Sequence, residues 1–264
     1  MTSHHTPLRF VFGFAVLWSV LYGFGRIGET SIDRGVIAAI TILFLALLLE
    51  AGVLATPRRD VPARLGLGRP GVRALVAALF VSLITLAALP VSAHLADEHL
   101  KLRTGWPWLA VSLLAYHGFA EELCWRGYTY GRLRCNRSFG AAVAATMPLI
   151  AITHVPIVIE SGFAVGVAAV GVAAITCVPL AHLYELGRRT IWPCAIVHAA
   201  IDGFKLIDDP QRYVGLSAVV AGAALVCPFA AFAWSRHPRS GVNPSLQPAG
   251  ALEPGVLIAR EDQR

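Results

Sequence analysis

Three short groups of ionisable residues lie within otherwise apolar stretches of the chain. They are Glu121, Glu122 and Arg126 in the run EELCWR; His154, between two prolines; and His198 with Asp202. A charged or imidazole side chain in apolar surroundings costs free energy unless it is paired or has a chemical role. Carboxylates and imidazoles are also the groups that most often move protons in catalysis. We therefore treat these residues as candidate site residues.

The spacing of the first group assigns different tasks to its members. On a helix, Glu122 and Arg126 are four residues apart and can form an ion pair, while Glu121 points about 100° away from Glu122. The pair would be structural, and Glu121 would be free to face another helix and act as a general base. His117 lies one turn before Glu121 and could hydrogen-bond to it. The alternative is that both glutamates are only packed and paired.

The other two groups also suit helices that aim side chains into a cavity. Two prolines flank His154, and prolines bend a helix. His198 and Asp202 are four residues apart and share one helix face. A helix rises about 1.5 Å per residue. By this count His154, His198 and Asp202 lie at a depth in the membrane similar to that of Glu121, in the same half. The sequence therefore predicts that they meet in one site.

Composition identifies the elements that must hold this site. Of the 264 residues, 56% are hydrophobic and only 14% are charged, and the mean hydropathy is +0.63. Because soluble domains carry about 25% charged residues, a soluble enzyme is excluded, as is a disordered chain. The net charge of +6 comes from basic residues spread between apolar blocks, which indicates membrane topology and no nucleic-acid partner. The sequence predicts an integral multi-pass protein of a bacterial-type cell membrane.

Eight apolar runs approach the roughly 20 residues that a membrane-spanning helix needs. They are 10–25, 35–57, 74–96, 104–120, 138–159, 161–184, 190–201 and 213–235. The fourth continues through the first motif, and the seventh reaches spanning length only with Asp202. Such unbroken runs lack the alternation of barrel strands. We therefore expect an all-α polytopic membrane helix bundle of about eight transmembrane helices.

Basic residues in the loops indicate the orientation of this bundle. One set of alternate loops, together with Arg9, Arg236 and Arg239 next to the first and last runs, carries 13 basic residues. The other set of loops carries 6, so both termini should be cytoplasmic. Residues 1–235 would form the bundle, and 236–264, rich in Pro, Gly and charge, would be a poorly ordered cytoplasmic tail. Glu50, His94, His182 and Glu185 lie near span ends, where we expect their polar tips to reach water.

In this order, the three groups resemble the motifs of the CPBP family of intramembrane proteases, which includes the CAAX prenyl endopeptidases of the Rce1 type. The family pattern is EExxxR, then FxxxH, then HxxxN or HxxxD, each on a separate membrane helix. The chain has EELCWR, then IAITH ending at His154, then HAAID from His198 to Asp202. The resemblance covers residues 108–207. Ile150 replaces the aromatic residue of the second motif, and Asp202 stands where an amide is common.

The resemblance implies hydrolysis of a peptide bond inside the membrane, in a membrane-embedded or lipidated protein or peptide. Glu121, helped by His154, would take a proton from the attacking water. His198 and the residue at 202 would stabilise the oxyanion of the tetrahedral intermediate. Since an ionised Asp202 cannot donate a hydrogen bond, we expect it to orient His198 and balance its charge. Glu122 and Arg126 would support the site.

Cofactor use and competing functions stay open at this point. Glu121, His154 and His198 are residue types that bind zinc, but the HExxH spacing is absent, so we expect no cofactor and keep zinc as an alternative. A non-catalytic relative could bind a membrane partner in an immunity or scaffold role. A proton-coupled transporter would use Glu121 and Glu122 as ion sites, but the sequence shows no clear repeats of the transporter kind. The oligomeric state is not indicated.

Overall fold

The computed structural model describes residues 6–27, 32–208 and 214–235, and this part of the chain is almost entirely helical. The predicted tail, 236–264, lies outside the described residues. The elements are α1 (Thr6–Ile27), α2 (Ile32–Leu48), η1 (Leu49–Val53), α3 (Val61–Arg64), α4 (Val72–Leu95), α5 (Trp106–Leu113), η2 (Leu114–Glu121), η3 (Leu123–Tyr130), α6 (Gly131–Leu133), η4 (Arg134–Asn136), α7 (Phe139–Ser161), α8 (Phe163–Leu186), α9 (Trp192–Ile201), η5 (Asp202–Leu206), α10 (Val214–Val226) and η7 (Cys227–Ser235). The predicted all-α fold is confirmed.

Six helices in the described ranges are long and apolar enough to cross a membrane. They are Pro7–Arg26, Asp33–Val53, Val72–Leu95, Phe139–Ser161, Phe163–Leu186 and Ala218–Ser235. The two other predicted spans are also helical, one as α5, η2 and η3 in succession and one as α9 followed by η5. The polytopic membrane bundle is therefore confirmed, whereas the total of eight spans stays a prediction.

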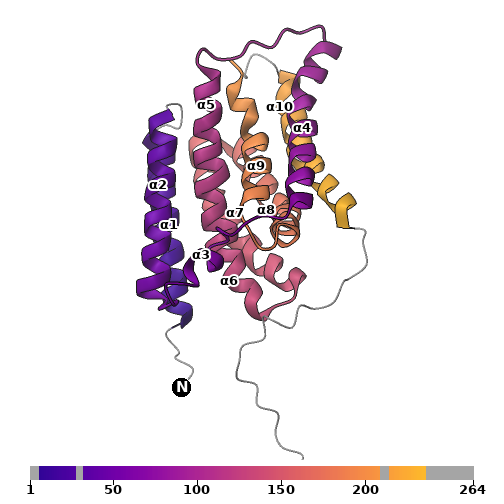
Figure 1. Cartoon of the computed structure of the whole chain (residues 1–264). Coiled ribbons are helices and arrows are strands. Elements are labelled where there is room, and N and C mark those ends of the chain that lie inside the picture. The colour runs from indigo at the N-terminus through magenta and orange to yellow at the C-terminus, as the bar shows by residue number, and fades with distance from the viewer. Residues whose placement is uncertain (1–5, 28–31, 209–213, 236–264) are drawn as a thin grey trace, which may run out of the picture.

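The two helices that carry the first and third motifs lie inside the bundle. Figure 1 shows α1 and α2 as a pair on one side and α4 with α10 on the other, with α5 and α9 between them. The η2 segment packs against both α2 and α9, and α9 also packs against α4. α7, which carries the second motif, packs along α8 and contacts η3. This arrangement turns the polar residues of the motifs toward protein rather than lipid.

Three Arg-bearing connections meet at one end of the bundle, where α3 and α6 lie and α1 begins (Figure 1). Hydrogen bonds join these connections and the end of η7: Ile191 N to Gly66 O (3.0 Å), Arg64 Nη1 to Cys135 Sγ (2.6 Å) and Arg73 Nη2 to Trp234 O. The basic loops thus share one end with the start of the first and the end of the last described helix, as the predicted topology requires. That this end faces the cytoplasm stays a prediction.

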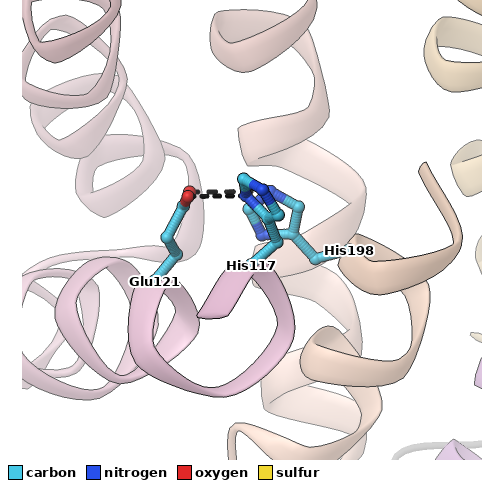
Figure 2. A group of neighbouring side chains, drawn as sticks. All are labelled: His117, Glu121 and His198. Carbon is cyan, nitrogen blue, oxygen red and sulfur yellow. Dashed lines mark hydrogen bonds and ion pairs between the residues drawn. The ribbon is translucent and has the colours of Figure 1, made fainter. Parts of the chain in front are cut away.

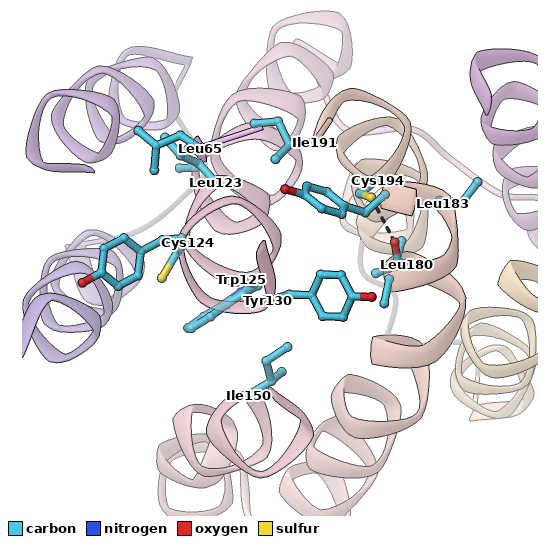
Figure 3. Close-up of a cluster of buried hydrophobic side chains, with 14 of the residues drawn as sticks. Leu65, Leu123, Cys124, Trp125, Tyr130, Ile150, Leu180, Leu183, Ile191 and Cys194 are labelled. Atoms are coloured by element: carbon cyan, nitrogen blue, oxygen red, sulfur yellow. Dashed lines mark hydrogen bonds between the residues drawn. The ribbon is translucent and has the colours of Figure 1, made fainter. Parts of the chain in front are cut away.

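The core of the bundle surrounds η3. All eight residues of this segment are buried. Figure 3 shows aliphatic side chains from helices and connecting segments around it, among them Leu65, Ile150, Leu180 and Ile191. Ile150, which replaces the aromatic residue of the family motif, is 3% exposed and packs in this cluster. Ile150 therefore contributes to the packing of the core.

Two glycines let the central helix approach its neighbours closely. A Cβ at Gly118 would lie 2.7 Å from the backbone oxygen of Ala195 in α9, and a Cβ at Gly127 would lie 2.4 Å from the backbone oxygen of Leu65. Real Cβ atoms essentially never come so close to a backbone atom. Gly118 therefore sets the spacing between η2 and α9, the two elements that supply the candidate site.

One prediction about the span ends is wrong. The side chain of Glu50 is fully buried rather than in contact with water, and its two oxygens lie 2.7 and 2.5 Å from Nη2 of Arg132. The sequence near the end of this span does not indicate that an arginine from another connection covers the carboxylate. The buried charge of Glu50 is tolerated because it is paired with Arg132. His94 is exposed, and His182 and Glu185 are partly exposed, as predicted.

Candidate active site

Glu121 lies at the centre of a row of side chains along one face of the η2–η3 helix. Nδ1 of His117, one turn earlier, lies 2.8 Å from its Oε1, and Nε1 of Trp125, one turn later, donates to its Oε2 at 3.3 Å. Figure 2 shows the Glu121 carboxylate pointing toward the rings of His117 and, from α9, His198. The predicted hydrogen bond between His117 and Glu121 is present.

A second row, on the adjacent face, contains the predicted ion pair. Nη1 of Arg126 donates to Oε1 of Glu122 at 2.8 Å, and both side chains are almost completely buried. The same Oε1 lies 2.6 Å from Nδ1 of His198. The Glu122–Arg126 pair therefore does not only stabilise its own helix, because Glu122 also binds His198 of the third motif.

The local geometry of this helix explains why two adjacent glutamates serve two sets of partners. The backbone follows wide π-helical turns over Leu114–Glu121 and Leu123–Tyr130. Such turns are rare and occur often at functional sites. Residues four apart still lie on nearly the same side of the helix, so their side chains are in contact. Glu121 and Glu122 then face His117 and Arg126 respectively, and both reach toward α9.

The third motif is positioned by α9 and by the tighter turn that follows it. Pro193 occupies the first turn of α9, where its missing N–H costs no hydrogen bond. Asp202 opens a 3-10 segment, η5, immediately after the last residue of α9. Nε2 of His198 lies 3.6 Å from Oδ2 of Asp202 and 3.7 Å from Oε2 of Glu121. The first and third motifs therefore meet in one cluster, as predicted.

Lys205 also belongs to this cluster, although it was not among the predicted site residues. Its Nζ lies 3.2 Å from Oδ1 of Asp202 and 2.7 Å from Nε2 of His117. The tight turn of η5 brings Lys205 back toward the site. Its position three residues after Asp202 was the available signal, because that spacing places the two side chains on the same side of a helical turn.

His154 lies apart from Glu121. Its Nδ1 lies 2.9 Å from the backbone oxygen of Ile150 and 3.3 Å from Oγ1 of Thr153, both in α7. Among the contacts of the described residues, neither a hydrogen bond nor an ion pair joins His154 to Glu121. Since a carbonyl oxygen only accepts, Nδ1 of His154 carries the proton and Nε2 is left as the basic nitrogen.

Charges in the cluster are matched with one exception. Arg126 pairs with Glu122, and Lys205 pairs with Asp202. In the described part of the chain, Glu121 pairs with imidazoles and with no arginine or lysine. Its side chain is 13% exposed, whereas that of Glu122 is 0% exposed. Because Glu121 is partly exposed and pairs only with imidazoles among the described contacts, it is available for a reaction with water.

The cluster fits a catalytic metal in residue type but poorly in arrangement. His117, Glu121 and His198 offer ligand atoms within 4.8 Å of one another, and three protein ligands are the usual number for catalytic zinc. However, His117 directs one ring nitrogen to Glu121 and the other to the Lys205 ammonium group. A cation here would displace the first contact and approach a positive charge. His154, part of the predicted zinc alternative, is outside this set.

Comparison with known proteins bears on the same segment. Residues 103–204 match the family model described as Type II CAAX prenyl endopeptidase Rce1-like. This segment contains all three motifs and ends one residue before Lys205. A search of curated proteins found no match to the chain. The family predicted from the motifs is thus confirmed over the part of the chain that holds the site.

Proposed function

Because residues 103–204 belong to the Rce1-like family of type II CAAX prenyl endopeptidases, we propose that this membrane protein is an intramembrane endopeptidase in which Glu121 activates water. The substrate would be a protein or peptide embedded in the bilayer or attached to it by a lipid. The observation that carries the proposal is the position of Glu121: it is partly accessible, lacks an arginine or lysine partner among the described contacts, and lies 3.7 Å from His198.

In the proposed reaction, the water oxygen forms a bond to the carbonyl carbon of the scissile peptide while Glu121 takes the proton. His117 and Trp125 hold the two carboxylate oxygens in place, which favours one orientation of the base. Collapse of the tetrahedral intermediate breaks the C–N bond, and the proton passes from Glu121 to the leaving nitrogen. One water is consumed for each peptide bond broken.

His198 would stabilise the oxyanion of this intermediate. Its Nδ1 donates to Glu122, so Nε2 is the nitrogen that can face substrate. Glu122, Asp202 and Glu121 lie within 4 Å of the ring and can balance the charge of an imidazolium. A donor aimed at a developing oxyanion contributes about 3 kcal/mol to transition-state stabilisation. Asp202 would orient the ring rather than donate to the substrate.

His154 keeps the role implied by the family motif, as a second base beside the attacking water. Nε2 of His154 makes no hydrogen bond among the described contacts, which supports this role, because that nitrogen can accept a proton while Nδ1 stays bonded to Ile150. A water between His154 and Glu121 would connect two groups that do not touch directly. His117, one turn before Glu121 on the same helix, supports Glu121 by a hydrogen bond.

The deciding experiment compares membrane proteomes from cells that contain the native protein or Glu121→Gln. We expect fragments that occur only with the native protein, together with accumulation of their uncut precursors in the variant. Glu98→Gln is the matched control, since Glu98 lies in the exposed connection after α4. Candidate substrates are then tested as purified peptides, with and without a prenyl group.

Three outcomes would contradict the proposal. If Glu121→Gln produces the same fragments as the native protein, Glu121 is not the base. If neither protein produces fragments but deletion still changes the abundance or location of one membrane protein, the non-catalytic binding alternative holds. Loss of function only on breaking the Glu122–Arg126 pair would indicate structural roles for these residues.

A further inference from the structure

We propose that Lys205 is a positioning residue that adapts this site to Asp202, by balancing the aspartate charge and by holding His117 in one tautomer. The inference rests on the proposed function, because it concerns the same water-activating cluster. Lys205 lies outside the segment that matches the family model. The chain has 22 basic residues, of which only Lys101 and Lys205 are lysines.

The contacts of Lys205 show the first part of this role. Its ammonium group lies 3.2 Å from Oδ1 of Asp202. The other oxygen of Asp202 is 3.6 Å from Nε2 of His198, the nitrogen assigned to the oxyanion. An unbalanced carboxylate at that place would repel a developing oxyanion and the charge on Glu121. An ammonium group on the far oxygen of Asp202 reduces this repulsion without occupying the space near His198.

The second part follows from donor and acceptor chemistry at His117. An ammonium group has three donors and no acceptor, so Nε2 of His117, 2.7 Å away, must accept. The ring proton of a neutral His117 is then on Nδ1, which donates to Oε1 of Glu121 at 2.8 Å. Lys205 at Nε2 and the Glu121 carboxylate at Nδ1 therefore favour the same tautomer, in which Glu121 receives a hydrogen bond from His117. The opposite tautomer would place two lone pairs against each other at Glu121.

The fold holds Lys205 in place for this task. Gly203, in the same turn, packs so closely against α4 that a Cβ there would lie 2.4 Å from the Leu86 side chain. Just beyond the turn, Arg103 N donates to Leu206 O at 2.9 Å and Asp208 N donates to Lys101 O at 2.7 Å. These bonds fasten η5 to the segment before α5. Lysine suits the position because its compact charge can contact two partners at once.

The first test reads the tautomer directly and needs no activity. Full-length protein with 15N-labelled histidine is reconstituted in lipid nanodiscs, and the ring nitrogens of His117 are identified by comparison with His117→Gln. We expect the native protein to show a protonated Nδ1 and an unprotonated Nε2, and Lys205→Met to change this pattern. A native protein with its proton on Nε2, or an unchanged pattern in Lys205→Met, overturns the proposal.

The second test uses cleavage of a substrate identified by proteomics. We expect Lys205→Met to lower kcat about 10- to 100-fold with little change in KM. The double variant Asp202→Asn/Lys205→Met should recover at least 10-fold of the loss, because the neutral amide needs no balancing charge. Lys101→Met, which removes the exposed partner of Asp208, is the matched control and should keep native kcat.

The two proposals fail in different ways. A double variant no more active than Lys205→Met shows that Asp202 and Lys205 are not coupled by charge, and overturns the inference while Glu121 catalysis stands. If native protein and Glu121→Gln cut equally, the proposed function fails, and the tautomer measurement alone then decides the role of Lys205. If Lys205→Met does not fold, the proposal is tested by the His117 tautomer of the native protein and by the activity of the double variant.

Discussion

Oε1 of Glu122 lies 2.6 Å from Nδ1 of His198 on α9 while it also accepts a hydrogen bond from Arg126 on its own helix. A single buried oxygen thus connects the first and third motifs. Glu122 fixes which nitrogen of His198 points away from it, and this direction is toward Glu121 and Asp202. The Glu122–Arg126 pair of the first motif therefore has a positioning function as well as a structural one.

The buried pair makes Arg126 a strong determinant of stability. Arg126→Met leaves the Glu122 carboxylate buried without its cation, and we expect a loss of about 3–5 kcal/mol in the free energy of unfolding. Arg126→Met/Glu122→Gln should regain most of that stability, because the buried charge is removed together with its partner. Thermal unfolding in detergent, followed by tryptophan fluorescence, measures both. Equal destabilisation in the single and double variants would contradict this account.

Gly118 tests whether the close approach of η2 and α9 matters for the site. Gly118→Ala places a methyl group 2.7 Å from the backbone oxygen of Ala195, so the helices must separate. We expect a loss of about 1–3 kcal/mol of stability and reduced cleavage. Gly171→Ala in α8, where nothing lies within 4 Å, is the control and should be neutral or slightly stabilising. Native stability and cleavage in Gly118→Ala would show that the spacing is not critical.

His117 and His154 can be separated by their effects on kinetics. His154→Gln removes the proposed second base, and we expect kcat to fall about 100-fold or more. His117→Gln keeps a hydrogen-bond donor for Glu121, so a smaller loss of about 10-fold is expected. Single-turnover cleavage in nanodiscs measures both variants. If His117→Gln lowers kcat more than His154→Gln does, His117 rather than His154 is the residue that assists Glu121.

Metal dependence provides a further test. Since the Lys205 ammonium group lies 2.7 Å from His117, we expect catalysis without zinc. Cleavage should then survive extended dialysis against a chelator, and purified protein should contain far less than one zinc per chain by mass spectrometry. Loss of activity on chelation with recovery on adding zinc would instead make His117, Glu121 and His198 a metal site, and would require Lys205 to move.

Local spacing was enough to predict some of the site. The Glu122–Arg126 pair was predictable because residues four apart on a helix are neighbours whatever surrounds them. The order of the three motifs predicted the family that residues 103–204 match. The meeting of Glu121 with His198 was predicted from similar depth along separate helices. These inferences need only distances along the helix axis.

Other relationships depended on how helices rotate and where the chain turns, which no single stretch of sequence specifies. Glu50 was expected in water, but Arg132 from a distant connection covers it. Lys205 was not predicted as a site residue, but the 3-10 turn after α9 brings it to the cluster.

The amino-acid sequence by itself determined that this chain lies in a membrane as helices and that carboxylates and imidazoles share one depth, because hydrophobic length and helical rise are local quantities. Only the tertiary structure decided which partner Glu122 shares with Arg126 and which charge balances Asp202. Those choices depend on the rotation of each helix about its axis, and packing between distant segments sets that rotation.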